Sequence, residues 1–152
     1  MNRWNTALVT FTLAVNVAFV MPAAASDQSD VEAAVTKWID DFNKGETKSF
    51  FAACAPHIAI IDDFPPYAWT TCKDWIKQNN TSSKEQQASG GSVSLGAPSA
   101  FEVQGDLAYT VYPATYSSGN GKFHAVQKGS WTLTLHKSHG RWLFTGAAWT
   151  DQ

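Results

Sequence analysis

The chain has 152 residues, a formal net charge of −2 at pH 7 and 44% hydrophobic residues. A chain of this length forms one domain with a core of its own. No run of basic residues occurs, so the composition disfavours nucleic acid and anionic membranes as partners. Six of the seven Trp residues lie after position 25, and this aromatic load suits a lined pocket, a subunit interface or an ordinary core.

Residues 1–25 have the pattern of a secretory signal peptide. Arg3 gives a short positive start, a mostly apolar run covers 7–20, and an Ala-x-Ala site ends at Ala25. Because the apolar run is too short to span a membrane comfortably, we predict cleavage after Ala25 rather than an uncleaved anchor. The predicted mature chain, residues 26–152, is a single domain exported to the periplasm or the medium, with no stable membrane insertion.

Three helices are predicted in the first half of the mature chain. Apolar residues from Val31 to Phe42 recur at helical spacing, and Ser29-Asp30-Val31-Glu32 fits a capping box at the start of this helix. Thr47 can cap a second, short helix, which Pro56 stops. Thr71-Cys72-Lys73-Asp74 resembles another capping box and predicts the start of a third helix.

Strands follow the helices. A buried strand is predicted from His57 to Ile61 and ends in two acids. After position 92 the chain is strand and turn, with strands predicted over 93–104 (one strand, or two pieces around Gly96), 107–116, 123–135 and 141–149. Helices that precede an antiparallel meander predict an α+β fold, with three N-terminal helices packed on a curved, mostly antiparallel sheet.

The last strand carries apolar side chains at both parities. Trp142 and Phe144 have one parity, whereas Leu143, Ala147 and Trp149 have the other. A strand that is apolar on both faces is typical of the centre of a sheet covered on both sides. We therefore expect this strand to be central and doubly covered.

The two cysteines, Cys54 and Cys72, are predicted to form a disulfide, because an even number in an exported protein favours pairing. The bond would stabilise the fold by roughly 3 kcal/mol in the chain-entropy model. Two buried free thiols are the alternative. A metal site is disfavoured, since no CxxC or HxxxH pattern accompanies the cysteines.

Several stretches of the sequence resemble the NTF2-like superfamily, which includes SnoaL-like and ketosteroid-isomerase-like proteins. They are Trp38-Ile39-Asp40-Asp41-Phe42, Gly105-Asp106-Leu107-Ala108-Tyr109, Gly129-Ser130-Trp131-Thr132-Leu133-Thr134-Leu135, Gly140-Arg141-Trp142 and Gly146-Ala147-Ala148-Trp149-Thr150. The resemblance covers essentially all of the predicted mature chain. It implies a cone-shaped barrel with an apolar pocket open at one end, and dimerisation through the outer sheet face. It does not fix an activity, since this fold hosts isomerases, cyclases, dehydratases, binders and dimerisation modules.

Asp62 and Asp63 are the candidate catalytic residues. Adjacent strand residues point in opposite directions, so we expect at most one of them to face the pocket. Asp62 continues the face of Ile58 and Ile60. A carboxylate at an apolar rim has a raised pKa and can serve as a general base. The structural alternative is that acids at a strand end accept hydrogen bonds from the backbone of the next turn.

Aromatic and histidine side chains are the candidate ligand contacts. They lie between the acids and the third helix, on the following strands and at two strand starts: Tyr67, Trp69, Trp75, Tyr109, His57 and His124. The alternative is that the rings fill a packed corner and that the histidines are polar boundary residues. No GxSxG, Walker A, GxGxxG or HExxH pattern occurs, so we predict neither a cofactor nor a metal.

Two functions fit these patterns. In the first, an exported NTF2-like domain binds a small apolar or amphipathic molecule in its barrel pocket, with acid/base chemistry led by Asp62 or Asp63. In the second, the domain is a non-catalytic interaction module. Its outer sheet face, with Trp131 or Trp142 on it, then forms a homodimer or docks another exported protein.

Overall fold

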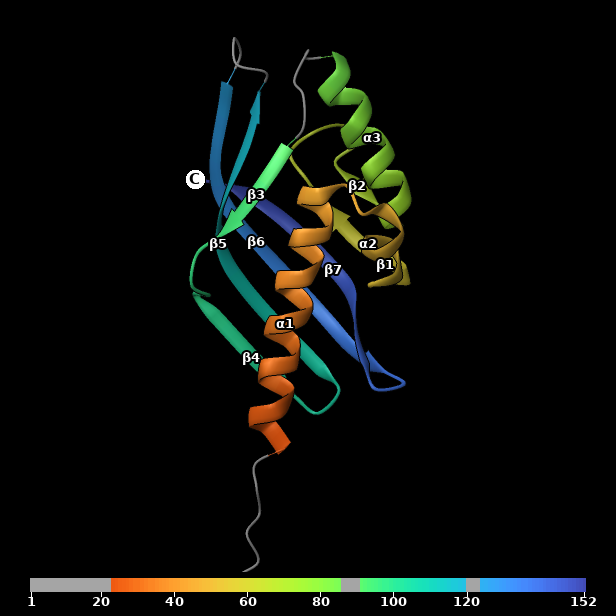
Figure 1. Ribbon diagram of the computed structural model, residues 1–152, viewed down its shortest axis with the longest axis vertical. Coiled ribbons are helices and arrows are strands. Elements are labelled where there is room, and N and C mark those ends of the chain that lie inside the picture. The colour runs from red at the N-terminus through yellow and green to blue at the C-terminus, as the bar shows by residue number, and fades with distance from the viewer. Residues whose placement is uncertain (1–22, 86–90, 120–123) are drawn as a thin grey trace, which may run out of the picture.

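The computed structural model describes residues 23–85, 91–119 and 124–152. Within them, the helices are α1 (Ala23–Lys44), α2 (Thr47–Ala52) and α3 (Cys72–Glu85). The strands are β1 (Cys54–Ile61), β2 (Ala68–Trp69), β3 (Gly91–Leu95), β4 (Ala100–Gln104), β5 (Leu107–Gly119), β6 (His124–Ser138) and β7 (Arg141–Asp151). The predicted α+β class is confirmed, because the helices pack on a curved sheet that is mostly antiparallel (Figure 1).

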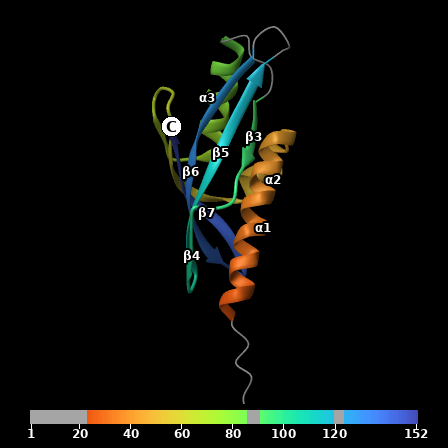
Figure 2. The ribbon, with the colours of Figure 1, turned by 90° about the vertical axis from the view of Figure 1, so that its left-hand side faces the viewer.

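The strand order is β2-β1-β7-β6-β5-β3, and β4 also pairs with β5. Among the described pairings, only that of β1 with β7 is parallel. β3 pairs with Ala114–Ser118 and β4 with Leu107–Val111, so the 93–104 segment forms two pieces along one edge of β5. Figure 2 shows α1 along one side of the sheet. Trp38 of α1 and Trp75 of α3 both pack on Trp131 of β6, so α3 lies on the same side. The core therefore lies between the helices and one sheet face.

A β-bulge at Thr145 decides which side chains of β7 face the core. Gly146 pairs with Thr134, but Phe144 pairs with the next residue, Leu135, which leaves Thr145 as an extra residue in β7. The extra residue reverses the inside–outside alternation. As a result, four buried side chains share the inner face: Trp142, Phe144, Ala147 and Trp149.

The bulge corrects one prediction about β7 and leaves another intact. β7 is central, between β1 and β6, as predicted. The expectation of two covered faces was wrong, because the helices cover one face and the outward side chains of Leu143, Thr145 and Ala148 stay partly exposed. The mixed apolar parity of the sequence arises from the bulge and not from double burial.

The helix starts agree with the capping predictions in part. α3 begins as predicted, because Thr71 Oγ1 accepts a hydrogen bond from the Asp74 backbone N–H at 3.1 Å and donates one to Asp74 Oδ2 at 2.7 Å. The predicted start of the first helix at Ser29 was wrong, since α1 begins at Ala23 and the upstream Ala residues are strong helix formers. α2 begins at Thr47 with no side-chain cap.

Pro56 does not end α2 but lies inside β1, since α2 stops at Ala52. The pairing of β1 with β7 shifts register between Cys54 and Ala59. Pro56 falls in this irregular stretch, where its missing N–H removes no regular ladder bond. A proline in a strand was therefore tolerated where the sequence pattern predicted a helix stop.

The predicted disulfide between Cys54 and Cys72 is present and joins the start of β1 to the start of α3. The signal-peptide prediction falls mostly outside the described residues and stays a prediction. No helix of the described residues is both long and apolar enough to cross a membrane.

Trp38 on α1 is the centre of the core. Its side chain is 1% exposed. Its ring stacks on Phe50 with centroids 4.8 Å apart and on Phe144 with centroids 4.5 Å apart. Trp131 meets the Trp38 ring edge-on at 6.4 Å. This aromatic cluster packs α1 and α2 against the sheet, and three of its members, Trp38, Phe50 and Trp131, line a cavity.

Candidate functional site

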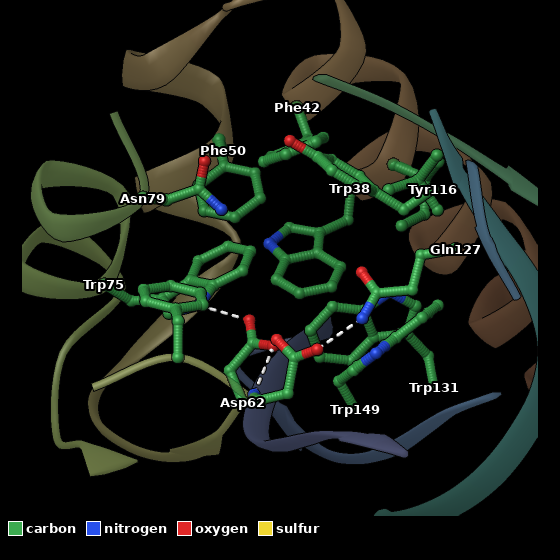
Figure 3. A pocket seen from close by; sticks show the side chains of 14 residues that line it. Trp38, Phe42, Phe50, Asp62, Trp75, Asn79, Tyr116, Gln127, Trp131 and Trp149 are labelled. Atoms are coloured by element: carbon green, nitrogen blue, oxygen red, sulfur yellow. Dashed lines mark hydrogen bonds between the residues drawn. The ribbon is translucent and has the colours of Figure 1, made fainter. Parts of the chain in front are cut away.

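A cavity of about 300 Å³ lies between the helices and the inner face of the sheet (Figure 3). Its walls come from all three helices, from β3, β5, β6 and β7, and from the segment after β1. The lining residues are Trp38, Ile39, Phe42, Phe50, Asp62, Asp63, Phe64, Trp75, Asn79, Val93, Tyr116, Gln127, Trp131 and Trp149. Eight of these fourteen residues are aromatic, so the cavity is suited to an organic molecule with substantial apolar surface.

Asp62 is the buried acid of this cavity. It follows β1 on the face of Ile58 and Ile60, which are 2% and 1% exposed, and it is itself 8% exposed. Asp62 Oδ2 accepts a hydrogen bond from Trp75 Nε1–H at 2.8 Å, and Asp62 Oδ1 accepts one from the Asp63 backbone N–H at 2.9 Å. Figure 3 shows both bonds directed at the carboxylate. The end of β1 and the first turns of α3 thus hold Asp62 in place.

Burial raises the pKa of Asp62 to about 6. The hydrogen bonds from the Asp63 backbone and from Trp75 oppose this rise, while the neighbouring Asp63 carboxylate adds to it. A carboxyl group with this pKa exchanges its proton close to neutral pH, as a general acid or base requires.

Asp63 is exposed at the mouth of the cavity, within a small polar network. Gln127 Nε2 donates hydrogen bonds to the Asp63 carboxylate and to Asp151 Oδ2, the latter at 3.0 Å. Asp151 Oδ1 also accepts a hydrogen bond from Trp149 Nε1–H at 3.1 Å. The network joins the end of β1 to β6 and to the end of β7. Both acids therefore line the cavity, although we expected at most one of them to do so.

Neither Gln127 nor Asp151 was predicted as a site residue from the sequence. Gln127 has the parity of Gly129 and Trp131, which face inward, so the alternation of β6 already contained a signal for it. Asp151 had no such signal, because its place at the mouth depends on the Thr145 bulge earlier in β7.

Two indole groups of the cavity wall have no hydrogen-bond partner within the described residues. They are the Nε1–H groups of Trp38 and Trp131, whose side chains are 1% and 5% exposed. A buried donor without an acceptor costs roughly 1–3 kcal/mol. A ligand oxygen close to these groups could supply the acceptor.

The predicted ligand contacts separate into three groups. Trp75 lines the cavity. Trp69 lies behind the wall, buried and packed on the Phe64 ring with centroids 4.8 Å apart. The other four are exposed and do not line this cavity, because they lie on the outer face, in the turn after β1 or at the start of β6: His57, Tyr67, Tyr109 and His124.

The interaction-module hypothesis placed Trp131 or Trp142 on the outer sheet face, and this placement was wrong. Both side chains are buried on the inner face, at 5% and 7% exposure. The outer face carries Thr132 and Ala148 together with the exposed side chains of Ile61 and Tyr109.

Among the described residues, no group of three or more His, Cys, Asp or Glu side chains is placed to hold a metal ion.

No family model matches the chain, and no curated protein matches it in sequence. Solved structures do match. A candidate scytalone dehydratase from Novosphingobium aromaticivorans has a TM-score of 0.69 at 11% identity, over 84% of this chain and 85% of that chain. The association domain of C. elegans CaMKII has a TM-score of 0.66 at 9% identity, over 85% and 98%. An NTF2-like protein of unknown function from Pseudomonas putida KT2440 has a TM-score of 0.63 at 13% identity, over 83% and 87%.

These similarities show that the chain has the NTF2-like fold, as the sequence resemblance predicted. At such low identity they define the fold alone. The same fold serves as an enzyme candidate in one neighbour and as an association domain in another. The function therefore has to be argued from the site.

Proposed function

We propose that the chain is an exported NTF2-like domain that binds a small, mostly apolar molecule in the aromatic cavity, with Asp62 as its acid/base group. The observation that carries this proposal is the Asp62 carboxyl, which is buried in the cavity wall and has a pKa of about 6. Burying a carboxylate is costly, and such groups occur more often at functional sites than elsewhere.

The hydrogen bonds that hold Asp62 leave its carboxylate free to contact a ligand. Each of its two oxygens accepts one hydrogen bond from the protein, and a carboxylate oxygen has two lone pairs. One lone pair on each oxygen thus remains for a ligand. In the proposed step, ionised Asp62 takes a proton from the bound molecule and returns it to another atom of that molecule. Trp75 and the Asp63 backbone keep the carboxylate oriented throughout.

Export rests on two features. The disulfide between Cys54 and Cys72 is typical of oxidising compartments, and the first 25 residues have the signal-peptide pattern. The test is native mass spectrometry of the protein recovered after export. A mass beginning at Ser26 and reduced by two hydrogens supports the proposal. A mass that retains residues 1–25 would refute cleavage.

Ligand binding is tested by calorimetric titration with 2-naphthol, a neutral aromatic probe. Val93 lines the cavity and is 7% exposed, whereas its neighbour Ser94 points away and is exposed. Val93→Phe should fill the cavity and abolish binding, while Ser94→Phe on the same strand should leave binding intact. Equal binding by both variants would place the probe elsewhere and refute the proposed site.

A homodimer formed through the outer sheet face is the second candidate function. The strand registers align one outward row across four strands: Ile61, Ala148, Thr132 and Val111. Ile61 at one end of the row is 56% exposed, and a row of small and apolar side chains suits a self-complementary interface. Sedimentation should show a dimer that Thr132→Lys dissociates, and a wild-type monomer at high micromolar concentration would refute it.

A further inference from the structure

The cavity mouth carries three carboxylates that take part in no described ion pair. Asp62, Asp63 and Asp151 all accept hydrogen bonds there from neutral donors: two indoles, one amide and one backbone N–H. The described ion pairs of the chain involve other acids: Asp27, Asp40 and Asp41. No Lys, Arg or His belongs to the described lining of the cavity. An anionic ligand would therefore meet repulsion without a compensating group.

Aromatic rings surround the same space at different inclinations. Trp75 and Trp131 lie nearly perpendicular, at 88°, with centroids 5.9 Å apart. Trp149 is tilted by 59° to Trp131 at 5.5 Å. Ring faces carry partial negative charge and attract cations, and aromatic boxes of this type bind substituted ammonium groups. Trp75 also donates to Asp62, so the box and the buried carboxylate are parts of one structure.

We propose that the ligand of this cavity is a compact organic cation, namely a substituted ammonium group with an oxygen acceptor a few bonds away. The aromatic rings and the carboxylates of Asp62 and Asp63 hold the ammonium group. The oxygen accepts a hydrogen bond from an unpartnered indole N–H, that of Trp38 or Trp131. This inference rests on the proposed function, since it names the class of molecule that the same cavity binds.

The test compares choline with 3,3-dimethylbutan-1-ol, which has the same shape but carries carbon in place of the charged nitrogen. Isothermal titration of the full mature chain should show choline binding at least tenfold more tightly than the alcohol. Asp62→Asn and Asp63→Asn should each weaken choline binding several-fold without weakening alcohol binding. Asp106→Asn is the matched control, because it removes an exposed carboxylate from the turn before β5, far from Tyr116 at the cavity end of that strand.

The pH dependence gives a second readout. Ionised Asp62 attracts the cation, whereas protonated Asp62 does not. With a pKa of about 6, most of Asp62 is protonated at pH 5, so choline should bind several-fold more weakly at pH 5 than at pH 7.5. The other titratable groups at this end of the cavity are Asp63, Asp151 and Tyr116, and none of them is basic. The alcohol should bind equally well at both pH values.

The outcomes separate the two proposals. If the alcohol binds as tightly as choline, or 2-naphthol binds and choline does not, the ligand is neutral; the cation inference is then overturned and the proposed function stands. If no probe binds, both proposals fail. Should Asp62→Asn not fold, Asp63→Asn decides the matter, because Asp63 is exposed and its substitution leaves the core intact.

Discussion

Replacing Asp62 with Asn should change the pH dependence of stability in a direction fixed by the burial of this residue. The pKa of Asp62 rises from 3.8 to about 6 on folding. Because the ionised form is disfavoured in the folded state, the free energy of unfolding falls as the pH rises from about 4 to about 6, and it levels off above that. Each pKa unit corresponds to about 1.4 kcal/mol. Ionisation of Asp62 therefore lowers the free energy of unfolding of the wild type by about 3 kcal/mol at pH 7.5, relative to the protein with Asp62 protonated.

The Asn variant removes this pH-dependent term but adds a constant cost. Both oxygens of Asp62 accept hydrogen bonds, and the Asn side chain has one acceptor, so one donor loses its partner at a cost of roughly 1–3 kcal/mol. The variant should therefore be less stable than the wild type at pH 4, by about that amount. Its stability relative to the wild type should then rise by roughly 2 kcal/mol between pH 4 and pH 7.5.

Urea denaturation followed by tryptophan fluorescence at pH 4, 5, 6 and 7.5 measures this difference. Asp106→Asn controls for the change in net charge. Parallel stability curves for the wild type and Asp62→Asn would refute the reasoning, since they would mean that the Asp62 carboxyl is as well solvated in the folded state as in the unfolded chain.

Three further predictions concern the framework of the site. Replacing both Cys54 and Cys72 with Ser should lower the free energy of unfolding by about 3 kcal/mol, and reductant should reproduce the loss in the wild type; an unchanged urea midpoint would contradict it. Trp38→Ala should cost about 3–5 kcal/mol in the same assay, because the ring is 1% exposed and stacks on two other rings, Phe50 and Phe144; a loss below about 1 kcal/mol would mean that the ring is not a core residue. Gly129→Ala should cost about 1–3 kcal/mol, because its Cβ would lie 2.4 Å from a backbone oxygen, whereas Gly96→Ala, with its nearest atom at 3.5 Å, should be close to neutral; equal effects would count against the close approach.

The face of β1 on which Asp62 lies could be predicted from the sequence. The other polar residues at the cavity mouth, Gln127 and Asp151, could not. Alternation from Ile58 and Ile60 places Asp62 on the inner face, and a short strand without bulges at its end keeps that parity. Its partner Trp75 could be placed near it because the capping box at Thr71 fixes where α3 begins. Local rules of this kind act over a few residues and survive folding.

The contacts that the sequence did not reveal depend on register between distant strands. Gln127 reaches Asp63 across 64 positions of the chain, and nothing local to either residue encodes that distance. The bulge at Thr145 left a signal, the change of apolar parity between Phe144 and Ala147, but burial of both faces of the strand predicts the same pattern. The error for Trp131 and Trp142 was of another kind, since large rings suit an interface and a core equally well.

The Thr145 bulge acts on the cavity from a distance. If Thr145 were instead paired regularly with Thr134, β7 would alternate strictly, and every side chain after Thr145 would change faces. Trp149 would then rotate toward solvent and leave the cavity wall. Asp151 would change faces as well and separate from Gln127, so the lip of the cavity would lose one of its three strands. A single unpaired residue in a central strand thus determines that the C-terminal side chains of the chain face the cavity.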